Sequence, residues 1–264
     1  KQNGVDFYHS ISFYEKWTDT NGDNIKQPSE LSNVRADLVD LSSEAPLAVS
    51  IDFWDDLKEA LDATDFAAAM STARPKRSVS YFKGERNEEK TWYQVGYNEF
   101  SQVAAATLSS GIAPPVTLKG TQIRKATVYF YGFTEDLLKK ADDPTIDVDM
   151  AIQISVAYDV IGKTQENIAD WVPLIQPEAP VSILDDPEAI DPTVTGRRSK
   201  TYHKGDSGEE ISDRALIYTA KDGKKPLHIN QYFYGEVWAD SNNDNVAQPS
   251  EVIHRKAEDA IQGE

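Results

Sequence analysis

The sequence predicts a mainly β protein that contains repeated units and short helical insertions. Short segments rich in aromatic and β-branched residues recur along the 264-residue chain, several of them with apolar residues at alternate positions. Polar turns separate these segments. Two of the motifs occur twice in the same order, which indicates that the β units are repeated.

The clearest strand is Pro46–Trp54, where apolar residues alternate from Leu47 to Phe53 and therefore fall on one face. The segment 151–158 has the same alternation. The remaining predicted strands share an aromatic and β-branched composition and cover residues 5–17, 77–83, 91–97 and 126–133.

Helical insertions are expected between these strands. Asp55–Ala73 has good helix formers without Gly or Pro, and its acidic first turn suits the helix dipole. Residues 32–41 are expected to form a short helix or a loop, and 99–109 a helical turn. The proline-rich stretch 173–192 predicts a long extended excursion on the surface.

Two motifs repeat at fixed order. Tyr129–Gly132 (YFYG) returns at Tyr232–Gly235, 103 positions later, and Arg198–Gly205 matches Arg77–Gly84 in five of eight letters, 121 positions apart. Tandem modules explain such ordered similarity; the alternative is the general likeness of aromatic strands. The predicted units are a β-rich unit at 1–123, a related unit at 124–227 and a partial third repeat at 228–264.

Composition excludes several classes of function. With 27 basic and 44 acidic residues the formal charge is −17, so we expect no nucleic-acid partner. No apolar run approaches the roughly 20 residues of a membrane helix, so no membrane insertion is expected. The absence of cysteine excludes disulfides, thiol catalysis and thiolate zinc sites.

An Asp- and Asn-rich stretch of twelve residues occurs near both ends, at Asp19–Glu30 and Asp240–Glu251. Oxygen ligands at positions 1, 3 and 5, a carbonyl at 7 and a Glu at 12 match a calcium loop, and Ca²⁺ is the predicted cofactor. The predicted ligands, taken in order along the chain, are Asp19, Asn21, Asp23, the Ile25 carbonyl, Gln27 and Glu30, then Asp240, Asn242, Asp244, the Val246 carbonyl, Gln248 and Glu251.

Position 6 of such a loop is usually Gly because the turn needs a positive φ. Here it is Asn24 or Asn245, the next most tolerant residue. The alternative for a single copy is a solvated turn without metal. The corresponding segment 134–149 has acids but not the spacing, so we expect a connection without metal, with a weak cation site as the alternative.

The segment from Val237-Trp238 through Asp240 to Glu251 resembles the calcium loop of the SdrD B-like modules of bacterial surface adhesins. The first copy, from Lys16-Trp17, resembles it over a similar length. The apolar residue lies at position 7 of the loop rather than at position 8 as in an EF-hand. The resemblance implies an extracellular Ig-like β-sandwich stabilised by calcium.

Candidate catalytic motifs are weak. Gly205-Asp206-Ser207-Gly208 spells a serine-protease nucleophile motif, but Glu209-Glu210 follow it, so a hairpin turn is expected. The four histidines form no pair with metal-ligand spacing; they are His9, His203, His228 and His254. His203 replaces Phe82 of the matching strand, which predicts a packed or edge side chain. We expect no enzymatic activity.

The sequence therefore predicts a bacterial protein outside the cell, at its surface or in the periplasm, that works in attachment, matrix or assembly. The alternative is a carbohydrate-binding module or accessory protein, with aromatic residues as a sugar platform or, alternatively, in the core. Those aromatics are Trp92, Tyr93, Tyr97 and Trp171. A glycan or another surface protein is the expected partner, and the C-terminal partial repeat allows self-association.

Overall fold

The structure is a computed structural model. It describes residues 9–36, 41, 44–54, 65–71, 75–98, 102–103, 116–117, 122–134, 137–160, 168–170, 172, 197–218, 226–234, 236–238, 248 and 252–257. The chain divides into two compact units. The first comprises Lys1–Val128 and Val160–Gln176, and the second comprises Tyr129–Asp159 and Pro177–Glu264.

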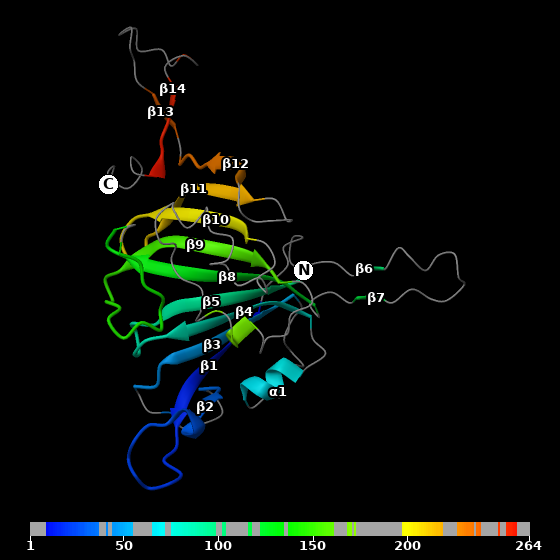
Figure 1. Cartoon of the computed structure of the whole chain (residues 1–264), viewed down its shortest axis with the longest axis vertical. Helices are drawn as coiled ribbons and strands as arrows, with labels where there is room; N and C mark the ends of the chain where they lie inside the picture. Colours follow the sequence, from blue (N-terminus) through cyan, green and yellow to red (C-terminus); the bar gives the residue numbers. More distant parts are fainter. Residues whose placement is uncertain are drawn as a thin grey trace, which may run out of the picture. The chain divides into compact units, whose positions relative to one another are not determined.

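The described residues are mainly β, with ten strands in one antiparallel sheet (Figure 1). The order across the sheet is β12-β11-β10-β9-β8-β5-β4-β3-β1-β2, so most neighbours in the sheet are also neighbours along the chain. The strands are β1 His9–Trp17, β2 Leu31–Val34, β3 Leu47–Phe53, β4 Lys76–Lys83, β5 Lys90–Tyr97, β8 Ile123–Gly132, β9 Ala151–Asp159, β10 Arg197–Lys204, β11 Ile211–Tyr218 and β12 Pro226–Gln231.

Smaller elements complete the described chain. The helical elements include the single turn η1 Pro28–Glu30 and the helix α1 Phe66–Ser71, and residues 168–170 are also helical. Two further two-stranded ladders pair β6 Gln102–Val103 with β7 Val116–Thr117, and β13 Glu236–Trp238 with β14 Val252–His254.

The mainly β fold class is confirmed, and each predicted strand is present within its described residues. The described strands do not show the finer prediction of Ig-like sandwiches in tandem. Of the predicted helix at 55–73, residues 65–71 are described and α1 covers six of them. Leu31–Val34 is a strand rather than a helix or loop, because it pairs with the end of β1. The stretch 173–192 lies outside the described residues.

The core of the first unit follows the predicted alternation. Val49, Ile51 and Phe53 of β3 are buried on one face, and the helix α1 covers this face. The Phe66 ring of α1 lies edge-on to Phe13 at 5.9 Å and to Tyr81 at 6.0 Å between ring centroids. Burial of this apolar face, rather than helix propensity, stabilises a helix as short as α1.

The opposite face of the same strands is polar. Ser10 and Ser50 share a hydrogen bond of 2.8 Å, and Ser78 donates to Asp52 over 2.8 Å. Gln94 donates to Ser80 over 3.0 Å. An antiparallel sheet with one apolar and one polar face needs a covering layer on one side alone.

The β4–β5 and β10–β11 hairpins have the same turn construction. Gly84 has φ +123° and Gly205 has φ +118°, and a Cβ on either would lie 2.7 Å from a backbone carbonyl oxygen. Glu89 accepts the backbone N–H of Leu47 at the start of β3 (2.8 Å), and Glu210 accepts that of Ile152 in β9 (2.9 Å). The turn 205–208 is thus a hairpin turn, as predicted.

Candidate metal centre

The first Asp-rich loop connects β1 to β2. These two strands are antiparallel, with Trp17 opposite Leu31, so the ladder brings the two ends of the loop together. The turn η1 forms its last residues and ends at Glu30, whose N–H bonds the Gln27 carbonyl over 3.0 Å. The Glu30 carbonyl in turn accepts the N–H of Thr18 over 3.0 Å. Position 12 of the loop is therefore fixed against position 1.

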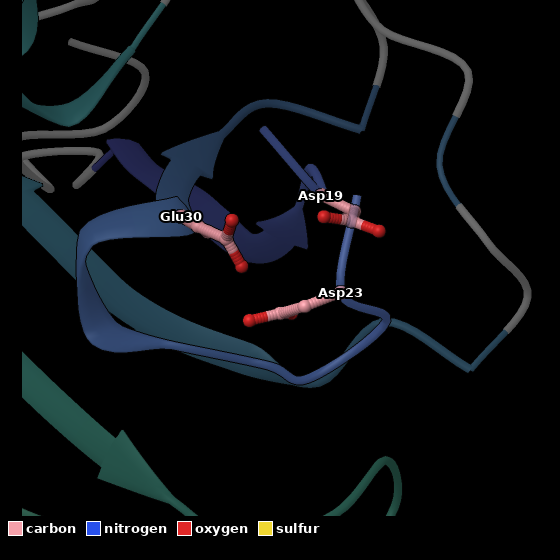
Figure 2. A group of neighbouring side chains, drawn as sticks. All are labelled: Asp19, Asp23 and Glu30. Carbon is pink, nitrogen blue, oxygen red and sulfur yellow. The ribbon is translucent and has the colours of Figure 1, made fainter. Parts of the chain in front are cut away.

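The loop gathers three carboxylates. One oxygen from each of Asp19, Asp23 and Glu30 lies within 4.8 Å of the other two. Figure 2 shows the Asp23 and Glu30 carboxylates directed into the space that the loop encloses, with Asp19 beside them. Calcium binds oxygens at about 2.3–2.6 Å, so oxygens on opposite sides of one ion are separated by up to about 5.2 Å. The three carboxylates are therefore close enough to share an ion.

Glu30 is the anchored carboxylate of this group. Its side chain is buried at 5% exposure and accepts three hydrogen bonds. The Trp17 indole N–H donates to one oxygen at 3.1 Å, and the N–H and hydroxyl of Thr20 donate to the other at 3.0 Å each. The Trp17 bond and then the Thr20 N–H lower the pKa of Glu30, and burial opposes them only partly. Glu30 is thus a fixed anion at neutral pH.

The two aspartates are held by the backbone of the loop. Asp19 accepts the N–H of Gly22 at 2.6 Å and that of Asn24 at 3.0 Å. Asp23 accepts the N–H of Ile25 at 2.7 Å. These bonds need a tight turn, and Gly22 and Asn24 have φ of +77° and +55°. The positive φ at position 6 is as expected, with Asn in place of Gly.

The other predicted ligands have different partners. Asn21 donates to Asp23 at 3.0 Å and accepts its N–H at 2.9 Å, while Gln27 donates to Asp23 at 2.8 Å. The Ile25 side chain is exposed. The structure therefore brings together the three carboxylates, whereas Asn21, Ile25 and Gln27 remain predicted ligands.

Sequence reasoning missed the donors to Glu30. Trp17 lies two positions before the loop, and the sequence pattern did not identify it as a hydrogen-bond donor to the last residue of the loop. The signal was present, because Trp17 and Glu30 bracket the loop and indole is a donor without an acceptor. Thr20, between two predicted ligands, had no distinguishing pattern.

Of the six predicted ligands in the second Asp-rich loop, Gln248 belongs to the described residues. The other five lie outside them. Its flanking strands are described. Trp238 of β13 pairs with Val252 of β14, and each lies 221 positions after its counterpart in the Trp17–Leu31 pair. The two loops are therefore bracketed by ladders in the same register.

The segment 134–149, after β8, has a different arrangement. The Lys139 ammonium donates to the Thr145 carbonyl at 2.7 Å, and Lys139 also bridges to Tyr131 through backbone hydrogen bonds. Asp143 accepts the N–H and hydroxyl of Thr145, which lowers the pKa of Asp143. Both bonds reach the same Asp143 oxygen, and the expectation of a connection without metal stays a prediction.

Two other candidate residues, His203 and Tyr93, pack against neighbouring side chains of the sheet. His203 is half-buried in β10, where its ring nitrogen lies 2.9 Å from the Ser155 hydroxyl, so it is a packed histidine as predicted. Tyr93 is 2% exposed and stacks on Tyr81 at 4.4 Å, which places this aromatic in the core. Trp171 lies outside the described residues.

Comparisons of the chain with protein-family models, with curated proteins and with solved structures found no match. Within the described residues, no helix has the length and apolar character needed to cross a membrane.

Proposed function

We propose that this chain is a non-enzymatic, extracellular bacterial protein whose β-sheet is stabilised by calcium, and that it works in surface attachment, matrix or assembly. One observation carries the proposal: three carboxylates converge in the loop between β1 and β2, each held by N–H donors. Calcium would offset the mutual repulsion of these anions and fix the loop to the end of β1.

The same proposal extends to the second loop. Its flanking ladder has the register of the first, and its sequence offers the same ligand types at the same positions. The resemblance to SdrD B-like calcium loops adds support for an extracellular site. Three formal charges among the ligands of a loop suit the high calcium concentrations outside cells.

Tandem organisation is a further part of the proposal. Tyr81 pairs with Tyr93 and Tyr202 with Arg214, each residue of the second pair lying 121 positions after its counterpart. A bulge follows Tyr81 in one hairpin and Tyr202 in the other. This equality of register supports related β units within the chain, each of them predicted to be Ig-like.

Thermal unfolding in calcium and in EGTA tests the proposal. Free calcium at 100 times Kd would stabilise the fold by about 2.7 kcal/mol, or about 5–10 °C in a protein of this size. Glu30→Gln removes a charged ligand and should lose the part of this shift that comes from the first loop. Asp143→Asn, in the loop after β8, is the matched control and should keep the full shift.

Equal melting of the wild-type chain in calcium and in EGTA would exclude a structural calcium site. Magnesium in place of calcium should give a smaller shift, because Mg²⁺ requires a tighter octahedral shell and retains water. Glu251→Gln should lose the part of the melting shift that comes from the second loop, so the contributions of the two loops can be measured separately.

A further inference from the structure

The strand β12 ends the ten-stranded sheet and is unusual in its exposure. All six residues of Pro226–Gln231 are exposed, including Leu227 at 66% and Ile229 at 62%. Phe233, just after the strand, is 52% exposed. Within the described residues, β12 pairs with β11 on one edge and has no strand on its other edge.

The register identifies β12 as the counterpart of β8. In the β5–β8 ladder Tyr93 lies opposite Val128, and in the β11–β12 ladder Arg214 lies opposite Gln231. Arg214 follows Tyr93 by 121 positions, and Gln231 follows Val128 by 103. These are the offsets at which the hairpin motif and the YFYG motif recur in the sequence. The two ladders are therefore equivalent residue by residue.

The two counterparts have different neighbours. β8 lies between β5 and β9 in the sheet, and its Ala126, Val128 and Phe130 are buried. The corresponding residues of the β12 segment are Ile229, Gln231 and Phe233, and all three are exposed. A strand position that is internal in one ladder is thus, among the described residues, a sheet edge in the other, and two of the three corresponding side chains, Ile229 and Phe233, are apolar.

The chemistry of this edge suits a second copy of the chain. Residues 226–234 (PLHINQYFY) contain no Asp, Glu, Lys or Arg, although the chain has a net charge of −17. Edge strands that avoid pairing normally have charges, prolines, bulges or a very short length. In β12 the proline and the bulge lie at its start, so His228–Gln231 is the regular and uncharged part of this edge. An uncharged strand is the place where two acidic molecules approach with least repulsion. The opposite end of the sheet is the four-residue strand β2.

We propose that two copies of this chain pair through the open edges of β12, antiparallel and about a two-fold axis. A two-fold axis perpendicular to the sheet makes the interface self-complementary, as in most homodimers. It also keeps the Ile229 and Phe233 side chains of both copies on one face, where cross-strand pairs form. The pairing involves none of the proposed metal ligands and does not rest on calcium binding.

Sedimentation equilibrium of the full chain over a range of concentrations tests the dimer. The expected result is twice the chain mass, in calcium and in EGTA alike. Ile229→Lys places a charge on the edge and should give a monomer with unchanged far-UV circular dichroism. Ser32→Lys, on the exposed position of β2, is the matched control and should leave the dimer intact.

Cysteine cross-linking provides a second measurement, since the chain has no cysteine of its own. Among single cysteines at His228, Asn230 and Tyr232, the one nearest the two-fold axis should form a disulfide-linked dimer, because a disulfide needs Cα atoms about 4.4–6.8 Å apart. The cysteines farther from the axis and Ser32→Cys should not. A monomer at every concentration, or a dimer that Ile229→Lys leaves intact, would overturn the proposal. Loss of the dimer in calcium-free buffer alone would also contradict it, because the edge has no calcium ligand.

Discussion

The β4–β5 and β10–β11 hairpins have the same turn geometry and the same strand register, but their side chains make different contacts. Both turns begin with a glycine at φ near +120°, and in both a Glu after the turn accepts the N–H of the neighbouring strand. At the same cross-strand position, however, Tyr81 stacks on the buried Tyr93, whereas Tyr202 lies 4.1 Å from the guanidinium of Arg214. Arg214 also bonds Asp213 over 2.7 Å.

A second difference concerns the loops that follow β1 and β8. After β1, three carboxylates converge; after β8, the ammonium of Lys139 binds a loop carbonyl. The two hairpins share the features that set backbone direction and register. They differ in side chains that fill the core or a loop. Sequence similarity within this chain therefore covers the hairpin turns and, in the YFYG motif, the buried Phe130 and Tyr131 at the end of β8.

Exchanging Tyr93 and Arg214, which occupy equivalent positions in the two hairpins, should give the largest change in the free energy of unfolding. Tyr93→Arg places a charge at a position 2% exposed and should destabilise the fold by about 3–5 kcal/mol. The reverse change, Arg214→Tyr, leaves Asp213 with Gln231 as a donor and should cost less than about 2 kcal/mol. Urea unfolding measures both. Equal losses would mean that the two positions have the same environment.

Removing the strand-capping carboxylates tests what the hairpins share. Glu89→Ala and Glu210→Ala each leave a strand N–H without its charged acceptor, so each should cost about 1.5–3 kcal/mol. The two losses should agree within about 0.5 kcal/mol. The Gln variants keep an acceptor oxygen and should lose about half as much in the same urea titrations. A loss at one position alone would break the equivalence.

At the last position of the first turn, Asn87 has φ +68°. Its counterpart in the second turn, Gly208, lies 121 positions later and has φ +89°. Asn87→Gly and Gly208→Asn should change the unfolding free energy by less than about 0.5 kcal/mol. Ala at either position should cost about 1–2 kcal/mol, although nothing lies within 4 Å of a Cβ at Gly208. Thermal unfolding of the four variants would separate backbone strain from crowding.

The smallest effect concerns pH. Burial lowers the pKa of His203 below its usual 6.5, so the unfolded chain binds this proton more readily than the folded one. Stability is therefore full above pH 6.5 and falls as the pH drops below it, by about 0.7 kcal/mol or less between pH 7 and 6. His203→Phe, which restores the residue of the matching strand, should remove this component from urea midpoints measured at both pH values.

Much of the fold was predictable because strand signals are local. The alternation from Leu47 to Phe53 is enough to assign β3 and the face that it buries. The single ten-stranded sheet was not predictable, because the Tyr93–Val128 pairing joins segments 35 positions apart by a register that no local pattern records. β2 was missed because Leu31–Val34 is short and becomes a strand by pairing with β1.

For the candidate site, spacing predicted the convergence of Asp19, Asp23 and Glu30, since a loop closed by a ladder returns position 12 to position 1. It did not predict the hydrogen bonds of Asn21 and Gln27 to Asp23. An amide side chain has a donor and an acceptor end, and the sequence does not state which end faces the loop interior.

The hydrogen bond from Trp17 to Glu30 gives the loop an optical signal of its own. The indole is 40% exposed, and its N–H contacts a carboxylate oxygen that calcium would coordinate. An ion bound there would withdraw electron density from the acceptor and shift the emission of this tryptophan. Fluorescence titration of the unlabelled chain, with Trp17→Phe as the blank, would then report occupancy of the first loop separately from the second.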